Sequence, residues 1–267
     1  MRSLPALYVQ QFKTSLAVML QYRASLIIWL ISHLLEPLVY LVVWTAVSAA
    51  QGGSVGGYDA AGFAAYFIVL MLVNHVTYTW IMWEYEYRVR HGSLSFALLR
   101  PVHPIHADLA DNLSSKIITL PLILAAAAVL AAIFRPSLHT PPWAAAAFVP
   151  AVLLAFAVRF LMEWTLALAA FWTTRVSALN RVYFVALLFL SGQMAPLSLL
   201  PPPIRLAATI LPFRWTTSFP VELLLGKLGL EETLLGLGAQ AAWILACVVL
   251  LRLVWRAGVR VFTAVGA

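Results

Sequence analysis

Six apolar runs divide the chain, and each is long enough to cross a bilayer as a helix. They cover approximately residues 25–49, 60–82, 117–134, 143–171, 182–200 and 234–254. A helix of about 20 apolar residues spans the ~30 Å hydrocarbon core, and it satisfies its own backbone hydrogen bonds where no water is present. The sequence therefore predicts an all-α integral membrane protein with six transmembrane helices.

The composition leaves little sequence for anything outside the membrane. Of the 267 residues, 63% are hydrophobic and only 10% are charged, so we predict a single transmembrane domain over residues 1–267. The net charge of +7 is spread between the apolar runs and forms no basic stripe, which argues against nucleic acid as a partner. Cys247 is the one cysteine, so we expect no internal disulfide, no cysteine metal cluster and no other metal site.

The distribution of Lys and Arg predicts the orientation of the spans, because cytosolic connections carry an excess of these residues. Twelve of them fall in the amino-terminal segment, the 84–116 segment, the 173–181 link and the tail, against four in the other connections. Those four are Arg135, Arg205, Arg214 and Lys227. The bias predicts that both termini lie in the cytosol.

Residues 1–24 precede the first span and have amphipathic spacing. Apolar residues such as Phe12 and Leu16 recur at helical intervals, with polar residues such as Gln11 and Lys13 between them. We expect a helix on the cytosolic membrane surface. A signal peptide fits less well, because the polar lead is long and the next apolar run is of spanning length.

The connection 195–233 is apolar but repeatedly interrupted by proline. Pro201, Pro202 and Pro203 are consecutive, and Pro212 and Pro220 follow. Non-helical backbone at membrane depth has to be covered by protein, so short re-entrant helices on the outer side fit better than a solvated loop. The glycine-rich connection 51–58, in contrast, is expected to be a flexible external loop.

Glu36, Arg159 and Glu163 are charged residues that lie well inside the apolar runs, away from their ends. An unpaired charge at the bilayer centre costs about 2.5–3.5 kcal/mol, so each should face protein, water or an opposite charge. Arg159 and Glu163 are four residues apart and can pair on one helix face, or one of them can meet Glu36. Two interpretations stay open: a polar lining of a substrate path, with Asn74 as a further polar candidate, or a structural ion pair that sets helix packing.

The 84–116 segment combines charged and apolar residues between the second and third runs. Its first part is expected to be a short charged helix that ends at Gly92, followed by Leu94, Phe96, Leu98 and Leu99. Apolar side chains beside charges on an exposed helix suit docking into a groove of a partner protein. The alternative is an amphipathic segment that rests on the inner leaflet.

His103, His106 and Asp108 in the same segment have a spacing that metal ligands could have. Pro101 and Pro104 interrupt the helix that would place them on one face. We therefore expect a solvated loop here and no metal site.

No phosphate-binding loop of the type Gly-x-x-x-x-Gly-Lys-Ser/Thr occurs in the chain. Residues 190–193 spell LSGQ, the signature tetrapeptide of ATP-binding cassette ATPases, but they lie within an apolar run and no phosphate loop accompanies them. No paired nucleophile and base has a catalytic context. We expect a chain without catalytic residues, in which any ATP is handled by another polypeptide.

Four stretches together resemble the membrane subunits of ABC-2 type exporters, in particular bacterial permeases that occur as two related membrane proteins with one ATPase. They are GSLSFALLRPVHP at 92–104, SGQMAPLSLLPPPIR at 191–205, LPFRWTTSFPVELLLGK at 211–227 and WRAGVRVFTAVGA at 255–267. With six spans and an amino-terminal surface helix, the likeness covers nearly the whole chain. The LSGQ tetrapeptide and the charged pair Arg159 and Glu163 depart from common patterns of this family.

The resemblance implies roles for three groups of residues. The 84–116 segment would be a coupling loop seated in the ATPase subunit through Glu84, Glu86, Arg88, Arg90, Gly92, Leu98, Leu99, Arg100 and Pro101. The 195–233 segment would close an external gate with Pro196, Pro212, Phe213, Pro220 and Glu222. Glu36, Asn74, Arg159 and Glu163 would line the substrate path.

The resemblance also implies the surroundings of the chain. ATP and Mg would be bound by the partner ATPase and not by this chain. The partners would be ATPase subunits, a second permease as a homodimer or paralogous heterodimer, and the lipids of a bacterial plasma membrane. The cargo would be an amphipathic lipid, glycan, peptide or drug.

Other classes of function are consistent with parts of the sequence. A proton- or ion-coupled secondary transporter would use Glu36 and Glu163 to carry the coupling ion, but it has no role for the 84–116 segment. An intramembrane enzyme would need a nucleophile and base or a metal triad. A purely structural membrane scaffold is the third alternative.

Overall fold

The structure is a computed structural model that describes residues 4–173 and 176–262. Among these residues, five helical segments are long and apolar enough to cross a membrane. They are α2 (Arg23–Ala50), α3 with α4 (Ala60–Thr77 and Ile81–Arg90), α6 (Ile105–Phe134), α7 (Pro142–Ala167) with the 3-10 turn η1 (Leu168–Phe171), and α12 (Leu230–Val261). The prediction of an all-α membrane fold is confirmed.

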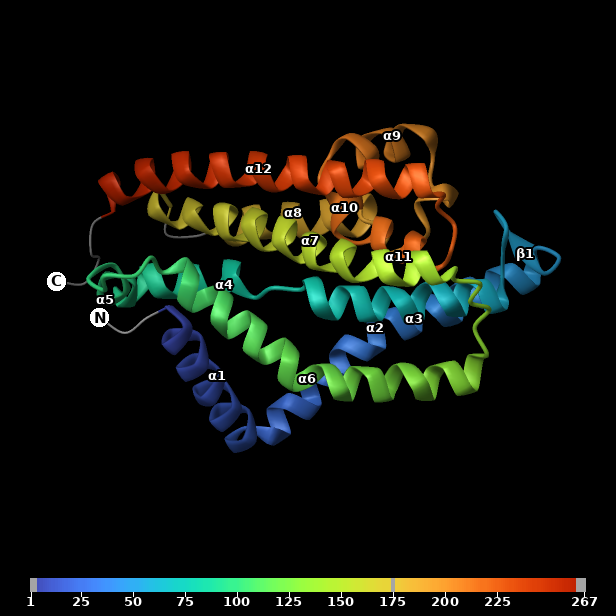
Figure 1. Cartoon of the computed structure of the whole chain (residues 1–267), viewed down its shortest axis with the longest axis horizontal. Coiled ribbons are helices and arrows are strands. Elements are labelled where there is room, and N and C mark those ends of the chain that lie inside the picture. The colour runs from blue at the N-terminus through green and yellow to red at the C-terminus, as the bar shows by residue number, and fades with distance from the viewer. Residues whose placement is uncertain (1–3, 174–175, 263–267) are drawn as a thin grey trace.

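The helices form an elongated bundle with two distinct ends (Figure 1). The start of α1 (Leu4–Gln21) and the end of α12 lie at the same end as α5 (Ser93–Leu98), and a small β-hairpin lies at the opposite end. We call these the α5 end and the hairpin end. Helices α7 and α12 run side by side along the bundle, and α1 packs against the first part of α6.

The predicted fifth span, 182–200, is wrong in its boundaries. Helix α8 (Ser177–Leu190) has 14 residues and reaches only about 21 Å. It ends within the LSGQ tetrapeptide, where Gly192 has a φ of +84° and its carbonyl accepts a hydrogen bond of 2.7 Å from the Tyr66 hydroxyl. A Cβ at Gly192 would lie 2.7 Å from that hydroxyl oxygen, so a glycine is required at this turn.

The second and third spans also differ from the prediction. The second span was expected to be one helix over 60–82, but the structure breaks it between Thr77 and Ile81, and α4 continues to Arg90. The third span was expected to begin at 117, yet α6 begins at Ile105. Both helices extend because they are buried on one side: Tyr85 and Val89 of α4 pack in the core at this end of the bundle, and Asp108 and Ala110 of α6 are buried as well.

Residues 51–58, expected to be a flexible loop, instead contain an ordered hairpin. Strand β1 (Ser54–Val55) pairs antiparallel with β2 (Tyr58–Asp59). Gly56 and Gly57 connect them with φ values of 55° and 80°, which suits a tight hairpin turn. Asp59 then caps α3 by accepting a 2.7 Å hydrogen bond from the amide of Gly62.

The proline-rich connection folds into short helices at the hairpin end (Figure 1). They are η2 (Leu197–Leu199), α9 (Pro202–Ile210), α10 (Phe213–Thr216) and α11 (Ser218–Leu224). Proline residues stand at or next to the start of three of them, where a missing amide hydrogen is tolerated. The short helices match the prediction, while their depth in a bilayer stays a prediction.

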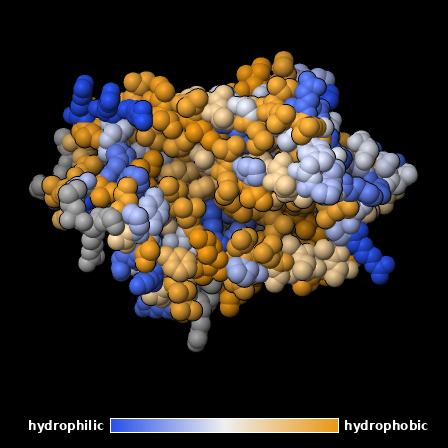
Figure 2. All heavy atoms as spheres, in the orientation of Figure 1, coloured by the Kyte–Doolittle hydropathy of each residue, from blue (hydrophilic) through white to orange (hydrophobic). Residues whose placement is uncertain are grey.

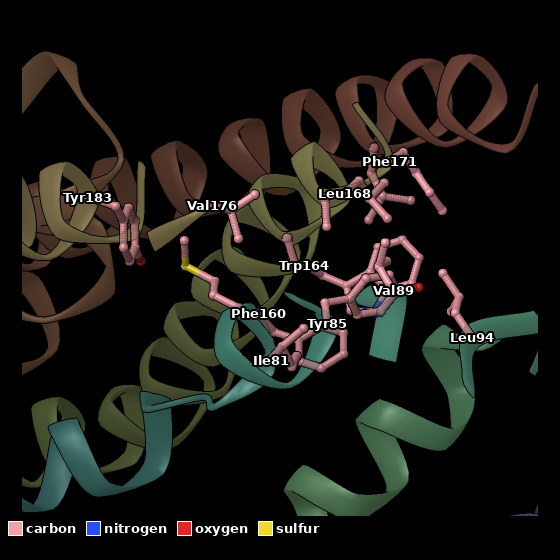
Figure 3. Close-up of a cluster of buried hydrophobic side chains, with 14 of the residues drawn as sticks. Ile81, Tyr85, Val89, Leu94, Phe160, Trp164, Leu168, Phe171, Val176 and Tyr183 are labelled. Atoms are coloured by element: carbon pink, nitrogen blue, oxygen red, sulfur yellow. The ribbon is translucent and has the colours of Figure 1, made fainter. Parts of the chain in front are cut away.

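The spans differ strongly in how far the rest of the chain covers them. The α3–α4 span is 67% buried and the α2 span only 12% buried. Apolar residues cover the middle of the face seen in Figure 2, and hydrophilic residues gather mostly toward the two ends. A cluster of aromatic side chains fixes α4 on α7 at the α5 end; Figure 3 shows Tyr85 and Val89 beside Trp164 and Phe171. Helix α3 is thus the central helix, and α2 faces lipid or another protein.

Candidate functional site

The break in the second span lies where buried polar groups gather. Residues 78–80 are not helical, and Thr77 and Thr79 on either side of Tyr78 are almost completely buried. Non-helical backbone at membrane depth needs partners inside the protein. The break has such partners: the Lys116 ammonium donates to the carbonyl oxygen of Tyr78, and the Thr79 hydroxyl donates to the carboxylate of Glu163.

Arg159 and Glu163 of α7 form a buried ion pair beside this break. The Arg159 Nε lies 2.8 Å from Glu163 Oε1, and the side chains are 2% and 0% exposed. Glu163 also accepts a 3.0 Å hydrogen bond from the Tyr183 hydroxyl, and Arg159 donates to Thr77 Oγ1 at 3.3 Å. We call Thr77, Thr79, Arg159, Glu163 and Tyr183 the membrane network. It joins α7 to the end of α3, to the break itself and to α8, and the predicted pairing of Arg159 with Glu163 is confirmed.

A cavity of about 480 Å³ lies next to this network. Its wall includes three of the four residues predicted for a substrate path, Glu36, Asn74 and Arg159, whereas Glu163 is completely buried behind Arg159. Gln193 of the LSGQ tetrapeptide also lines the cavity and donates a 3.2 Å hydrogen bond to Asn74. We call this space the central cavity.

A second cavity of about 320 Å³ opens between α1, the start of α2 and α6. Its wall is mostly aromatic and apolar, with Trp29 and Trp80, but it also contains Lys116. His75 and Tyr78 line both cavities and therefore separate them. Lys116 is one of the twelve cations that were predicted to lie in the cytosol. Lys116 directly precedes the apolar run 117–134, and this position could have indicated that its side chain lies inside the bundle.

Three of the residues predicted for ATPase contact are used to hold α4 in place. Arg88 pairs with Glu84 and, through Nη1, with Asp108 Oδ1 at 2.6 Å. Asp108 accepts a 2.9 Å hydrogen bond from the Trp164 indole as well, and Glu86 accepts one of 3.2 Å from the amide of Val176. We call Glu84, Arg88, Asp108 and Trp164 the α4 network.

Among the remaining predicted contact residues, Leu98, Leu99, Arg100 and Pro101 lie in a partly exposed tip. The tip segment, residues 93–101, follows a turn at Gly92, whose φ is +67°. Phe96 is 72% exposed and Leu99 is 82% exposed. Arg90, Arg100 and Pro101 are also exposed, whereas Leu98 packs partly against the core. Gly92 therefore turns the chain from α4 into a segment whose Leu94 packs in the core and whose Phe96 and Leu99 are exposed.

The expectation of a solvated loop around His103 is wrong. Its ring lies 4.4 Å from the Trp255 ring between centroids, and burial lowers the pKa of its imidazole. His106 contacts the Tyr8 hydroxyl at 3.3 Å, and Asp108 belongs to the α4 network. No group of three His, Cys, Asp or Glu residues in the described part of the chain is arranged to hold a metal ion.

The predicted gate residues at the hairpin end lie close together in the short helices. Pro196 and Pro212 precede η2 and α10, and Pro220 is buried in α11. Glu222 accepts a 2.8 Å hydrogen bond from Ser218 and pairs at 3.0 Å with Arg214. Phe213 packs against Tyr183 of α8 at 5.9 Å between ring centroids. Sequence reasoning missed Arg214, which sits eight residues before Glu222 and gives no helical pairing signal.

These features define a polytopic membrane protein with a polar centre, two adjoining cavities and an exposed apolar tip at one end. The family model described as ABC-2 family transporter protein matches residues 30–266, and the chain belongs to that family. No curated protein and no solved structure matched the chain. The resemblance drawn from the four sequence stretches is therefore confirmed, and the chain is a membrane component of the ABC transporter type.

Proposed function

We propose that this chain is the membrane subunit of an ATP-driven exporter in a bacterial plasma membrane. Separate ATPase subunits bind ATP and Mg at the α5 end, which faces the cytosol with both termini. The substrate is an amphipathic lipid, glycan, peptide or drug. The observation that carries the proposal is the exposed tip segment on a helix that is itself fixed to the core: Leu99 and Phe96 are open to a partner, while Tyr85 and Val89 of α4 are buried.

The arrangement suits mechanical transmission from the tip to the cavities. Helix α4 begins at the break and ends at the turn before the tip, so a push on the tip is carried along α4 to residues 78–80. Tyr78 lies at that break and in the wall of both cavities. Closure of the ATPase subunits on ATP would shift Tyr78 relative to Arg159 and so change the access between the two cavities.

The exposure of α2 supports a second membrane subunit, identical or paralogous. Glu36 is exposed on α2 and lines the central cavity. A carboxylate that faces lipid at this depth costs about 2.5–3.5 kcal/mol. A second permease packed against this face would shield Glu36 and close the open side of the cavity.

The geometry argues against the proton-coupled alternative. Glu163 accepts hydrogen bonds from two hydroxyl groups and is paired with Arg159. Protonation of this carboxylate would leave a buried guanidinium without its counter-charge. Transport that continues without ATP and stops when the proton gradient collapses would favour the alternative.

The tip segment provides the direct test. Leu99→Glu places a charge in the proposed contact and should reduce the amount of ATPase subunit that co-purifies in mild detergent at least tenfold. Leu230→Glu is the matched control, because Leu230 is 62% exposed and lies beside Glu231 and Glu232 at the hairpin end. Both variants should keep the thermal unfolding temperature of the wild type. Unchanged ATPase recovery with Leu99→Glu would overturn the proposal.

A further inference from the structure

We infer that the hairpin end carries a binding site for a phosphate-bearing anion. A cavity of about 420 Å³ opens there, separate from the two cavities at the membrane network. Its walls come from the β-hairpin, η2, α9, α10, α11 and the turn before α12. The polar groups that line it include Ser198, Arg205, Arg214, Glu222 and Lys227.

Positive charge exceeds negative charge in this cavity. Three cations and one carboxylate line it, and the carboxylate of Glu222 is paired with Arg214. Arg205 and Lys227 make no ion pair with a carboxylate of the described residues. The residues that line the cavity therefore carry an excess of two positive charges, which favours binding of an anion.

Arg214 has donor capacity left over after its pairing with Glu222. Its Nη2 donates to Glu222 at 3.0 Å, but its buried Nε has no hydrogen-bond partner among the described residues. A buried donor without a partner is unfavourable by about 1–3 kcal/mol. The Arg214 side chain is 25% exposed, so the accessible part of its guanidinium can contact the oxygens of a phosphate group.

The third cation is held over the cavity by a rigid turn. Gly226 has a φ of +69°, and a Cβ there would lie 2.5 Å from the carbonyl oxygen of His139. The next residue, Lys227, places its ammonium 3.0 Å from the centroid of the Tyr58 ring. Partial burial lowers the pKa of Lys227. An anion in the cavity would offset this effect because it stabilises the charged ammonium.

The placement of these cations runs against the charge bias of the chain. Only Arg135, Arg205, Arg214 and Lys227 fall in the connections with few basic residues, and three of these four line one cavity. Lys and Arg are disfavoured in connections on the non-cytosolic side of a membrane, which is the side predicted for the hairpin end. Their gathering therefore fits a ligand better than it fits membrane orientation.

The cavity also has room for more than the anionic group. Its volume lies within the range of about 300–1,000 Å³ that is usual for small-molecule sites. Leu197 and Leu228 add apolar wall beside the cations. A lipid headgroup and a free phosphate compound both carry a phosphate group, and binding of two different probes distinguishes these sources.

The test measures binding to the full chain in nanodiscs of phosphatidylcholine, without any ATPase subunit. Inorganic phosphate and dioctanoyl phosphatidic acid serve as probes, and the dissociation constant is read from microscale thermophoresis. Arg205→Gln and Lys227→Gln should each weaken binding about tenfold, and the double variant about a hundredfold. Raising the salt concentration should weaken binding as well.

Arg135→Gln is the matched control, because it removes the fourth cation of this side, which does not line the cavity. It should leave the dissociation constant unchanged. Binding of both probes supports a site for the phosphate group itself, and binding of phosphatidic acid alone supports a lipid headgroup site. Failure of both probes to bind the wild type, or an equal loss in Arg135→Gln, would overturn the inference. Neither result bears on ATP coupling, which is tested through the tip segment.

Discussion

The membrane network and the α4 network use the same sequence spacing in different surroundings. Arg159 pairs with Glu163 and Arg88 pairs with Glu84, in each case four residues apart on one helix. The first pair is 2% and 0% exposed, whereas the second is 25% and 44% exposed. An i,i+4 pair in water contributes only a few tenths of a kcal/mol. In a buried pair, removal of one partner is strongly destabilising, because the other charge then stays buried without a counter-charge.

The two networks also differ in what they connect. The membrane network bridges α7, α8 and the break beside Tyr78, so its members surround the place where the second span is interrupted. In the α4 network, Asp108 is the one buried carboxylate, and it links Arg88 of α4 to Trp164 of α7. The role of each pair therefore depends on its burial and on which elements it joins, and the shared spacing does not decide it.

Removal of the charge of Glu163 should have the largest effect. Glu163→Gln leaves the Arg159 guanidinium buried without its counter-charge, and we expect a loss of stability of about 3–5 kcal/mol. The measurement is thermal unfolding of the purified chain in detergent, where the midpoint should fall by on the order of 10 °C.

A paired variant tests whether the ion pair is structural only. Arg159→Met with Glu163→Leu removes both charges and keeps much of the side-chain volume, so it should recover most of the lost stability. If transport is lost in this stable double variant, the pair also serves the substrate path. A wild-type midpoint in Glu163→Gln would contradict the assignment of a tightly coupled buried pair.

Asp108→Asn should have an intermediate effect. It removes the buried carboxylate that pairs with Arg88, but Arg88 keeps its ion pair with Glu84. We expect a loss of about 1.5–3 kcal/mol, the range for a hydrogen bond to a charged group. The matched control is Asp111→Asn on the same helix, where the exposed carboxylate accepts hydrogen bonds of 2.8 Å and 3.1 Å from Ser15 and Gln11. Urea unfolding should show a smaller change for Asp111→Asn, and an equal change would contradict the special role of Asp108.

Arg90→Ala should have the smallest effect. Its pair with Glu86 is 3.8 Å long, and Arg90 is half exposed. Exposed pairs contribute about 0–1 kcal/mol, so the unfolding midpoint should stay close to that of the wild type. A loss as large as that of Asp108→Asn would show that Arg90 has a further partner at the α5 end.

Much of the fold could be predicted because the bilayer imposes a simple rule on apolar length. The runs at 60–82, 143–171 and 234–254 each fall on a spanning helix, although their ends differ from the predictions by up to several residues. The errors occurred where tertiary contacts extend or stop a helix. Tyr66 stabilises the turn at Gly192, and the packing of Tyr85 and Val89 extends α4 beyond the apolar run.

The candidate site could be predicted only in part. The pairing of Arg159 with Glu163 followed from their spacing, and Glu36, Asn74 and Arg159 do line one cavity. Lys116 and Tyr78 were not recognised as neighbours of that site, because Lys116 belongs to another helix and Tyr78 carries no charge that would have marked it. The end of the charged helix at Gly92 was predicted, but its attachment to the core through Arg88 and Asp108 was not, since charged residues on a surface and in a packed network look alike in sequence.

The sequence by itself determined the all-helical membrane class, the family and the pairing of charges within one helix, because apolar length, motif order and helical spacing are local properties. Only the tertiary structure decided which charges are buried, where the second span breaks and which cations gather at the hairpin end. Those features depend on contacts between residues far apart in the sequence, such as Thr79 with Glu163 and Lys227 with Tyr58. Burial changes the energy of a charge far more than its neighbours in sequence do, so the packing of the helices sets the role of each polar residue.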